Sequence, residues 1–137
     1  MHRRFCIMFL ILCSFGLSIP SLHGQFSFIE EPYNMLQASF LKEKEEIDPD
    51  VSFFNVLKIE NPTDRRLRFD VSFSIPGGWV FMGERTQSIL LNPGESKLLP
   101  LRASANINTL GDIGYSIVAA LKDNNGRVFK NIYSFVN

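Results

Sequence analysis

The sequence predicts an all-β protein, a sandwich of seven strands that follows an N-terminal export signal. Three observations support this prediction. From residue 51 onward, apolar and polar residues alternate with the period of two that is typical of strands with one wet face. Turn-forming groups rich in Asn, Pro, Gly and Asp separate the alternating runs at near-regular intervals. No convincing helical pattern follows residue 50, and 137 residues suit one β-sandwich domain.

Residues 1–24 are predicted to be a secretory signal peptide. The basic start MHRR precedes the apolar run FCIMFLILCSFGL, and SIPSLHG then supplies a breaker and small residues before Gln25. This is the order of regions in a signal peptide, and the apolar run is short for a membrane span. A retained membrane anchor is the alternative. Because Cys13 follows Ile11 and Leu12 rather than a small residue, we expect an exported chain without a lipid.

Removal of this segment would take every cysteine and histidine with it. These residues are Cys6, Cys13, His2 and His23. Hydrolase sites built on a histidine base are then excluded, and structural zinc, which uses Cys and His ligands, is nearly excluded. The remaining carboxylates, lysines and tyrosines show no paired geometry. We therefore expect a protein that is not an enzyme and uses no cofactor.

Charge argues against a nucleic-acid partner. Without Arg3 and Arg4 the chain keeps 12 basic residues against 14 acidic ones, a formal net charge of −2. No basic stripe is available to bind phosphates. A cystine-free exported domain must rely on its hydrophobic core, and ten of the thirteen phenylalanines lie beyond residue 24.

Residues 25–50 are predicted to be a leader with a short first strand and an acidic loop. Residues 25–35 have weak periodicity and contain Pro32, so we expect an extended segment. LQASFLK (36–42) can form a first strand, although a helix over 35–46 competes because its residues are good helix formers. EKEEIDPDV follows as an acidic connection with an Asp-Pro-Asp turn. Its carboxylates could attract calcium, but their spacing fits no known loop, so a solvated loop is expected.

Residues 51–137 are predicted to form the sandwich core. The run VSFFNVLKIE has one apolar face with Asn55 as the exception, and LRFDVSFSI is the cleanest alternation in the chain. RTQSILL and KLLPLRASA are the next strands, and Pro100 indicates that the second of them lies at an edge or carries a bulge. DNNG joins IGYSIVAALK to RVFKNIYSFV as a hairpin turn, because Asn and Gly tolerate positive φ.

The glycines of PGGW have an expected structural role. Gly77 and Gly78 let the backbone turn sharply where the preceding strand leaves its sheet. Trp79 then lands just beyond the strand, where its large apolar area can close the end of the core. A ligand-binding role would normally need aromatic company, and only Phe81 is near. Packing is therefore the preferred role of this tryptophan.

The order of the turn motifs resembles a known family. ENPTD ends one strand, IPGGW ends the next, LNPGES opens another, and GDIGYSIVAAL leads into the last hairpin. This order, over residues 51–136, is similar to the NPCBM-associated, NEW3-type immunoglobulin-like domains of bacterial exported proteins. The resemblance implies an immunoglobulin-like sandwich and an accessory module without catalytic residues. Tyr115 resembles the tyrosine corner of such sandwiches, whose hydroxyl bonds to upstream backbone. The chain departs from the family pattern at Gly77 and Pro100.

A surplus of apolar residues suggests that the module acts in protein–protein contact in the bacterial envelope. The last strand carries Phe129, Tyr133 and Phe135 on one face, although its other face is also apolar. Phe54 and Val56 repeat this surplus in an earlier strand. Either the leader covers the second face, or a partner does. That partner would be another envelope protein or further domains of the same polypeptide, and the last strand could also be an edge open to β-augmentation.

Two other functions stay open at this point. A carbohydrate-binding accessory module would use Trp79, Phe81 and Tyr33, although no fixed polar groups are evident beside them. A subunit or chaperone of a surface-fibre system would use the leader as a donor strand. In each case we expect the protein in the periplasm or at the surface of a Gram-negative bacterium.

Overall fold

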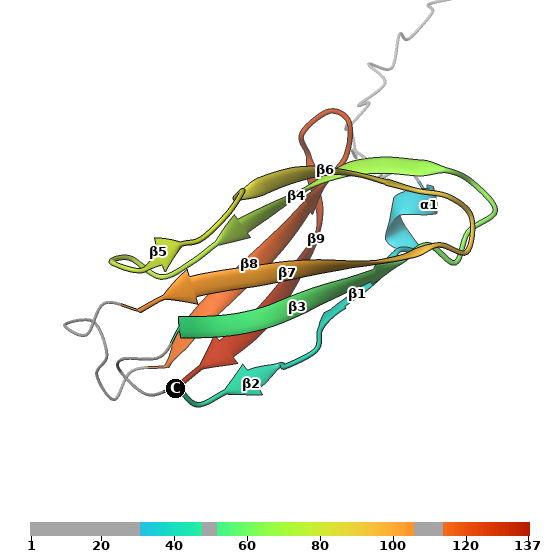
Figure 1. The fold of residues 1–137 in the computed structure, drawn as a ribbon. Helices are drawn as coiled ribbons and strands as arrows, with labels where there is room; N and C mark the ends of the chain where they lie inside the picture. The colour runs from blue at the N-terminus through green and yellow to red at the C-terminus, as the bar shows by residue number, and fades with distance from the viewer. Residues whose placement is uncertain (1–30, 48–51, 106–113) are drawn as a thin grey trace, which may run out of the picture.

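The computed structural model describes residues 31–47, 52–105 and 114–137. In these residues two β-sheets pack face to face, which confirms the β-sandwich (Figure 1). The described part has nine strands rather than the predicted seven, because β2 and β5 are only two residues long and too short to show alternation. The predicted signal peptide and Asp-Pro-Asp turn lie outside the described residues. Within the described ranges, no helix is long and apolar enough to cross a bilayer.

The first sheet, here called sheet A, has the order β1-β3-β7-β5. Its neighbouring strands are antiparallel throughout. The strands are β1 (Gln37–Phe40), β3 (Ser52–Glu60), β7 (Ser96–Ser104) and β5 (Val80–Phe81). In Figure 1 β3 and β7 run through the middle of this layer, and β1 lies beside β3.

The second sheet, sheet B, has the order β2-β9-β8-β4-β6. β2 joins β9 in parallel, and the other pairs are antiparallel. The strands are β2 (Lys44–Glu45), β9 (Val128–Val136), β8 (Tyr115–Lys122), β4 (Leu67–Ser74) and β6 (Thr86–Leu91). β2 and β6 therefore form the two opposite edges of this sheet.

The hydrophobic core lies between the sheets and follows the predicted alternation. In β4 the residues Leu67, Phe69, Val71 and Phe73 are buried, whereas their neighbours along the strand are more exposed. β3, β7 and β8 repeat the pattern with one inward face each. Burying apolar area at about 25 cal/mol per Å2 is the main stabilising contribution to such a core.

The leader is an integral part of the sandwich. A short helix, α1 (Glu31–Asn34), replaces the extended segment expected there, and the competing helix over 35–46 is absent. β1 pairs with β3 in sheet A, and β2 then pairs with β9 in sheet B, so the chain changes sheets between them (Figure 1). Tyr33, Leu36 and Phe40 are buried in the core. The first strand of the domain is thus supplied by its own leader.

Pro100 lies where β7 has a neighbour on one side only. β5 pairs with β7 at Ala103 and Ser104, beyond the proline. Pro100 pairs with Val56 of β3. The Val56 carbonyl accepts a hydrogen bond from the Leu41 N–H at 2.9 Å, so the backbone groups of Val56 point toward β1 and away from Pro100. The nitrogen of Pro100 therefore faces the open side of β7, where no N–H is required.

The PGGW segment forms a tight turn that carries Trp79 into the core. The Trp79 N–H donates to the Pro76 carbonyl at 3.2 Å, and Gly78 has φ of +83°, as the third residue of a type II turn does. Trp79 is only 5% exposed, and its ring lies 6.3 Å from that of Phe53 and 5.8 Å from that of Tyr115. The turn thus places the tryptophan at the end of the sandwich.

The two glycines of this turn should respond differently to substitution. Gly78→Ala is expected to lower the free energy of unfolding by about 1–2 kcal/mol, because alanine is strained at this positive φ. Gly77 has no positive φ, and an added Cβ there meets nothing within 4 Å. Gly77→Ala should therefore be neutral or stabilise by up to about 1 kcal/mol. Urea denaturation measures the free energy of unfolding of both variants, and an equal loss of stability in the two would contradict the assigned turn.

The hairpin between β8 and β9 is held by Asp123. The Asp123 carbonyl accepts a hydrogen bond from the Gly126 N–H at 2.9 Å, and only Gly126 of the DNNG segment has a positive φ. The predicted hairpin is confirmed, and a type I turn followed by one left-handed glycine closes it. The Asp123 carboxylate accepts bonds from the N–H groups of Asn125 (2.8 Å) and Arg127 (2.9 Å) and from the Arg127 guanidinium (2.9 Å).

Acid should weaken the fold in part through this carboxylate. Burial by itself would raise the pKa of Asp123, but the hydrogen bonds from Arg127 and Asn125 lower the pKa overall. A lowered folded-state pKa adds stability above the ordinary aspartate pKa of about 3.9, and this stability is lost as the pH falls through the folded-state value. Unfolding free energies measured from pH 7 to pH 2 should fall less steeply in Asp123→Asn below pH 4. Identical acid slopes in the two proteins would contradict this role.

Candidate functional site

The five residues predicted to form an interface lie in three different places. Phe54 and Val56 point outward from sheet A, on β3. Tyr133 and Phe135 point outward from sheet B, on β9, and both are exposed. Phe129 packs against the core. The predicted residues therefore do not form one surface.

A β-bulge in β9 turns Phe129 toward the core, so this residue does not belong to the predicted interface. The pairing of β8 with β9 shifts between Leu121 and Lys122, which leaves Phe129 as an extra residue and breaks the alternation of β9. Its ring lies 5.0 Å from that of Tyr33 in the leader and 6.2 Å from that of Phe69 in the core. The leader thus covers this part of the apolar surplus.

Tyr133 and Phe135 form a small aromatic pair on the outer face of sheet B. Their rings are stacked at 6.4 Å with 12° between the planes, and they are 49% and 53% exposed. Their cross-strand neighbours on β8 are Val118 and Ser116. β9 is not the open edge that the sequence left possible, because β8 lies on one side and β2 pairs with its C-terminal end on the other.

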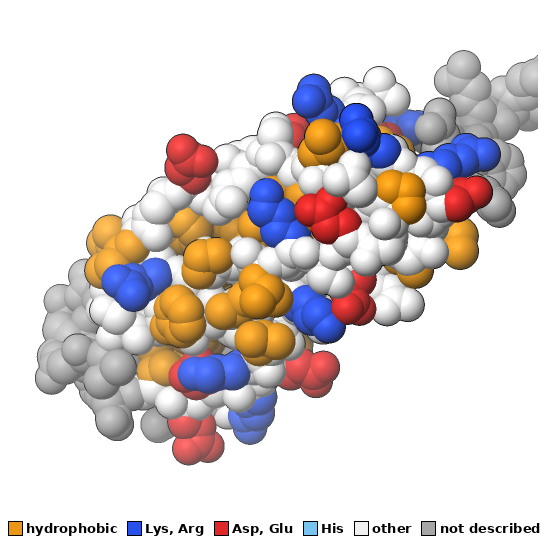
Figure 2. Space-filling view, turned by 45° about the vertical axis from the view of Figure 1, so that its right-hand side comes forward, with side chains coloured by type: hydrophobic (Ala, Val, Ile, Leu, Met, Phe, Trp, Pro, Cys, Tyr) orange, Lys and Arg blue, Asp and Glu red, His pale blue; other side chains and the backbone are white. Residues whose placement is uncertain are grey.

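A broader group of exposed hydrophobic side chains covers the outer face of sheet A. We call it the outer apolar patch, and it consists of Leu41, Phe54, Val56, Val80, Met82, Leu98 and Pro100. Five of these, all except Val56 and Pro100, are large side chains with exposed fractions from 43% to 61%. Figure 2 shows a cluster of hydrophobic side chains in the left half of the view, with charged residues around it.

The register of sheet A brings these side chains together. Phe54 pairs with Arg102 and Val56 with Pro100 across β3 and β7. The Met82 N–H donates to the Arg102 carbonyl at 2.9 Å, which holds the segment after β5 against β7. Phe54, Met82, Pro100 and Arg102 line a shallow hollow of about 260 Å3.

Arg102 contributes a positive charge to the outer apolar patch. Its guanidinium carbon lies 5.9 Å from the centroid of the Phe54 ring, a cation–π contact. No ion pair of Arg102 is found among the residues that the structure describes. Glu60, on the same face of β3, is held by Lys58 at 2.7 Å, and the hydrogen bond from Lys58 is the main cause that lowers the pKa of Glu60. Aromatic residues and arginine are both enriched at protein interfaces.

The aromatic residues considered for carbohydrate binding lie mostly inside the domain. Trp79 is 5% exposed and Tyr33 is 8% exposed. The Tyr33 hydroxyl donates to the Arg68 carbonyl at 2.8 Å, and the half-buried Phe81 stacks on Phe73 at 5.8 Å. These three rings therefore offer no common platform to a sugar.

No metal-binding cluster is found in the described ranges. No group of three or more His, Cys, Asp or Glu side chains lies close enough there to hold a metal ion. Asp48 and Asp50 of the acidic loop lie outside those ranges. The hydroxyl of Tyr115 was expected to bond to upstream backbone, and residues 106–113 also lie outside the described residues.

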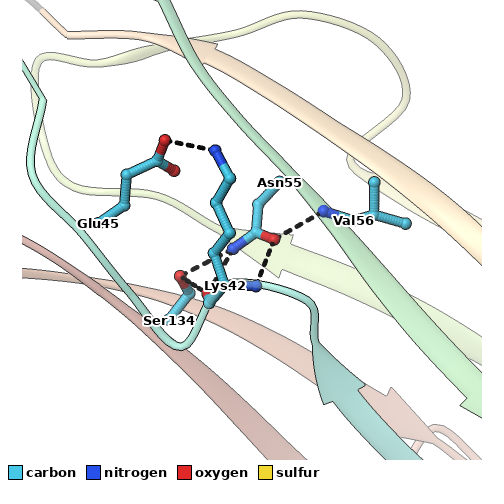
Figure 3. A network of polar contacts seen from close by, with 5 residues as sticks. All are labelled: Lys42, Glu45, Asn55, Val56 and Ser134. Carbon is cyan, nitrogen blue, oxygen red and sulfur yellow. Dashed lines mark hydrogen bonds and ion pairs between the residues drawn. The ribbon is translucent and has the colours of Figure 1, made fainter.

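A buried polar network, which the sequence pattern marked only as an exception, lies where the leader changes sheets (Figure 3). Asn55 is buried, and its amide donates to the Lys42 carbonyl at 2.7 Å and to the Ser134 hydroxyl at 3.0 Å. Its amide oxygen accepts from the N–H groups of Lys42 (3.1 Å) and Val56 (2.8 Å). The network links the crossover to β3 in one sheet and β9 in the other. Asn55 bonds to backbone groups of Lys42 and Val56 and to the Ser134 hydroxyl, so its contacts tie backbone segments together.

Comparisons with known proteins agree with the fold. No protein-family model and no curated protein sequence matches the chain. Among solved structures, a FixG-related protein from Vibrio parahaemolyticus is similar, with a TM-score of 0.54 and 20% identity over 74% of this chain and 94% of that one. The alpha-2-macroglobulin of E. coli in its native conformation gives a TM-score of 0.57 and 17% identity over 74% of this chain. The match spans 6% of that much longer protein. At these identities the comparisons establish the immunoglobulin-like sandwich and nothing finer.

Proposed function

We propose that this chain is an exported, non-catalytic immunoglobulin-like module that binds another protein through the outer apolar patch. The exposure of that patch is the observation that carries the proposal. A two-layer sandwich needs apolar residues only on its inward faces, and a contiguous exposed apolar surface usually marks a contact site. Phe54 and Arg102 would be its central contacts, because aromatic and arginine side chains contribute most at interfaces.

The setting we propose is the bacterial envelope, in the periplasm or at the cell surface. The signal-peptide pattern of residues 1–24 supports export. The similar solved structures come from bacterial proteins, and the turn motifs resemble those of NEW3-type accessory domains. The partner would be another envelope protein or further domains of the same polypeptide. Catalysis, cofactors and nucleic acid have no part in this function.

The alternative role as a donor-strand subunit of a surface fibre is less well supported. A donor strand leaves its own domain and completes a neighbouring one. In this chain β1 and β2 each form one edge of a sheet, and they pair with β3 and β9 of the same chain. The described part of the leader, residues 31–47, is thus already used within its own sandwich.

Affinity capture from the native envelope with matched variants tests the proposal. Phe54→Asp places a charge in the outer apolar patch, and Tyr133→Asp places one on a comparably exposed aromatic residue of sheet B. We expect one stoichiometric partner with the wild type and with Tyr133→Asp. Capture by Phe54→Asp should fall at least about tenfold, as expected at an interface hot spot. Equal capture by both folded variants would contradict the assigned surface.

A further inference from the structure

The outer edge of β6 is a strand edge with no partner among the described residues. β6 (Thr86–Leu91) ends the order of sheet B and pairs only with β4. In Figure 1 it lies at the side of the sandwich opposite to β1 and β2. Its six residues include no charge, no proline and no glycine.

The alternation of hydrogen-bonded and non-hydrogen-bonded pairs between β4 and β6 shows which backbone groups of β6 face that edge. The Phe73 N–H donates to the Arg85 carbonyl at 2.8 Å, next to the paired residues Ser72 and Thr86. Bonded residues alternate along an antiparallel pair, so Thr86, Ser88 and Leu90 direct their N–H and C=O groups away from β4. Within the described part of the chain, no hydrogen bond to these backbone groups is found. They present three donors and three acceptors at the spacing of a strand.

The other edges of the sandwich carry features that discourage strand addition. At the edges of sheet A, β1 has only four residues and β5 only two, and Pro100 removes the N–H on the open side of β7 beyond β5. At the other edge of sheet B, β2 has only two residues. β9 is covered by β2 at its C-terminal end, and Tyr33 of the leader packs on Phe129 near its N-terminal end. Short strands, prolines and covering segments are the devices by which natural sheets protect their edges. β6 has none of them.

We propose that β6 pairs in antiparallel fashion with β6 of a second copy of this chain. A two-fold axis through Ser88 places Ser88 opposite Ser88 and Thr86 opposite Leu90, so each of the three pairs closes two hydrogen bonds. Two five-stranded sheets then become one continuous sheet. The pairing uses sheet B and leaves the outer apolar patch of sheet A free.

A second copy fits this edge because its pairing brings no charges together. Like charges directly opposite each other destabilise a strand pair, and the β6 segment carries none. The carboxylate of Asp70, opposite Ser88 on β4, accepts a hydrogen bond from the Ser88 hydroxyl. Leu90, which is exposed in the single chain, would be partly buried against Thr86 of the other copy. The edge itself offers backbone groups and small side chains, which a symmetric strand satisfies without a specific pocket.

Sedimentation of the purified exported chain with matched lysine variants tests the pairing. The wild type should approach twice the monomer mass as its concentration rises. Ser88→Lys places two lysines opposite each other and should raise the dimer dissociation constant at least tenfold. Ser116 is an exposed serine on the same outer face, and Ser116→Lys should leave the dimer dissociation constant unchanged. A monomer at every concentration, or a dimer that Ser88→Lys does not weaken, would overturn the proposal. So would a dimer that is lost only in Leu98→Lys, because that residue belongs to the outer apolar patch.

Disulfide trapping gives a second test that does not depend on affinity. Paired residues at a hydrogen-bonded position lie about 5.5 Å apart between Cα atoms, which is within disulfide reach. Removal of residues 1–24 leaves the exported chain without cysteine, so Ser88→Cys should form a covalent dimer under mild oxidation. Ser116→Cys should remain monomeric under the same conditions. Equal crosslinking of both variants would show random collision and would overturn the assigned register.

Discussion

Leu36→Ala should destabilise the domain by about 3 kcal/mol, although Leu36 belongs to the leader rather than to a main strand. The side chain is fully buried in the core. Removing a buried leucine side chain costs about 2–5 kcal/mol, because apolar burial is lost and a cavity remains. Since small domains have only about 5–15 kcal/mol of total stability, this is a large share.

Met35→Ala is the matched control, because Met35 is the neighbouring residue and is 57% exposed. Its effect should stay within about 0.5 kcal/mol, as is usual for surface substitutions. Urea or thermal unfolding measures both variants. Deletion of residues 25–36, which removes Tyr33 as well, should abolish the cooperative transition. A stable monomer after that deletion would contradict an integral leader and would restore the donor-strand hypothesis.

Asn55→Ala should cost about 2–4 kcal/mol, which is unusual for the loss of a polar side chain. The substitution leaves the N–H of Lys42 without the amide oxygen that it donates to, at a place where both sheets meet. An unsatisfied buried donor costs about 1–3 kcal/mol, and the cavity adds to this loss. The leader crossover should loosen at the same time.

Ser134→Ala serves as the control for this network. The Lys42 carbonyl would keep its bond from the Asn55 amide at 2.7 Å, so the loss should be about 1 kcal/mol. Denaturant unfolding separates the two variants, and hydrogen exchange at β1 and β2 reports on the crossover. Equal stability of Asn55→Ala and the wild type would mean that the network does not hold the leader.

Local patterns in the sequence predicted the architecture well because burial in a sandwich follows a period of two. The alternation of β4 is realised in the structure, and the PGGW turn places Trp79 in the core, the role expected of it. The two extra strands, β2 and β5, could not be predicted, since two residues cannot show a period. Their pairing depends on long-range geometry at the sheet edges.

Polar residues inside the core were harder to interpret from the sequence. Asn55 was visible as an exception on an apolar face, but its partners Lys42 and Ser134 lie 13 and 79 residues away. Asn61 lies in the turn after β3, where its amide oxygen accepts a hydrogen bond from the Thr63 N–H at 3.1 Å. It is also buried, and its amide donates to the Arg65 carbonyl at 2.7 Å and to the Asn92 carbonyl at 3.0 Å. Asn61 therefore links the two Asn-Pro turns, a contact that no local pattern encodes.

The candidate interface was predicted only in part for a similar reason. Alternation predicts which residues of one strand share a face, but one bulge moved Phe129 to the inside. Alternation also does not tell on which side of the sandwich two strands lie, so Phe54 and Tyr133 were grouped although they belong to different sheets. The members of the outer apolar patch from β5 and β7 became visible only through the register of sheet A.

Site-specific photocrosslinking in the native cells is the measurement that tests the role of the outer apolar patch most directly. A photoreactive phenylalanine analogue at position 54 should crosslink to one defined envelope protein. The same analogue at position 133, which is equally an exposed aromatic position but on sheet B, should give no such product. A product that forms from position 133 and not from position 54 would place the contact on the other sheet and contradict the proposed function.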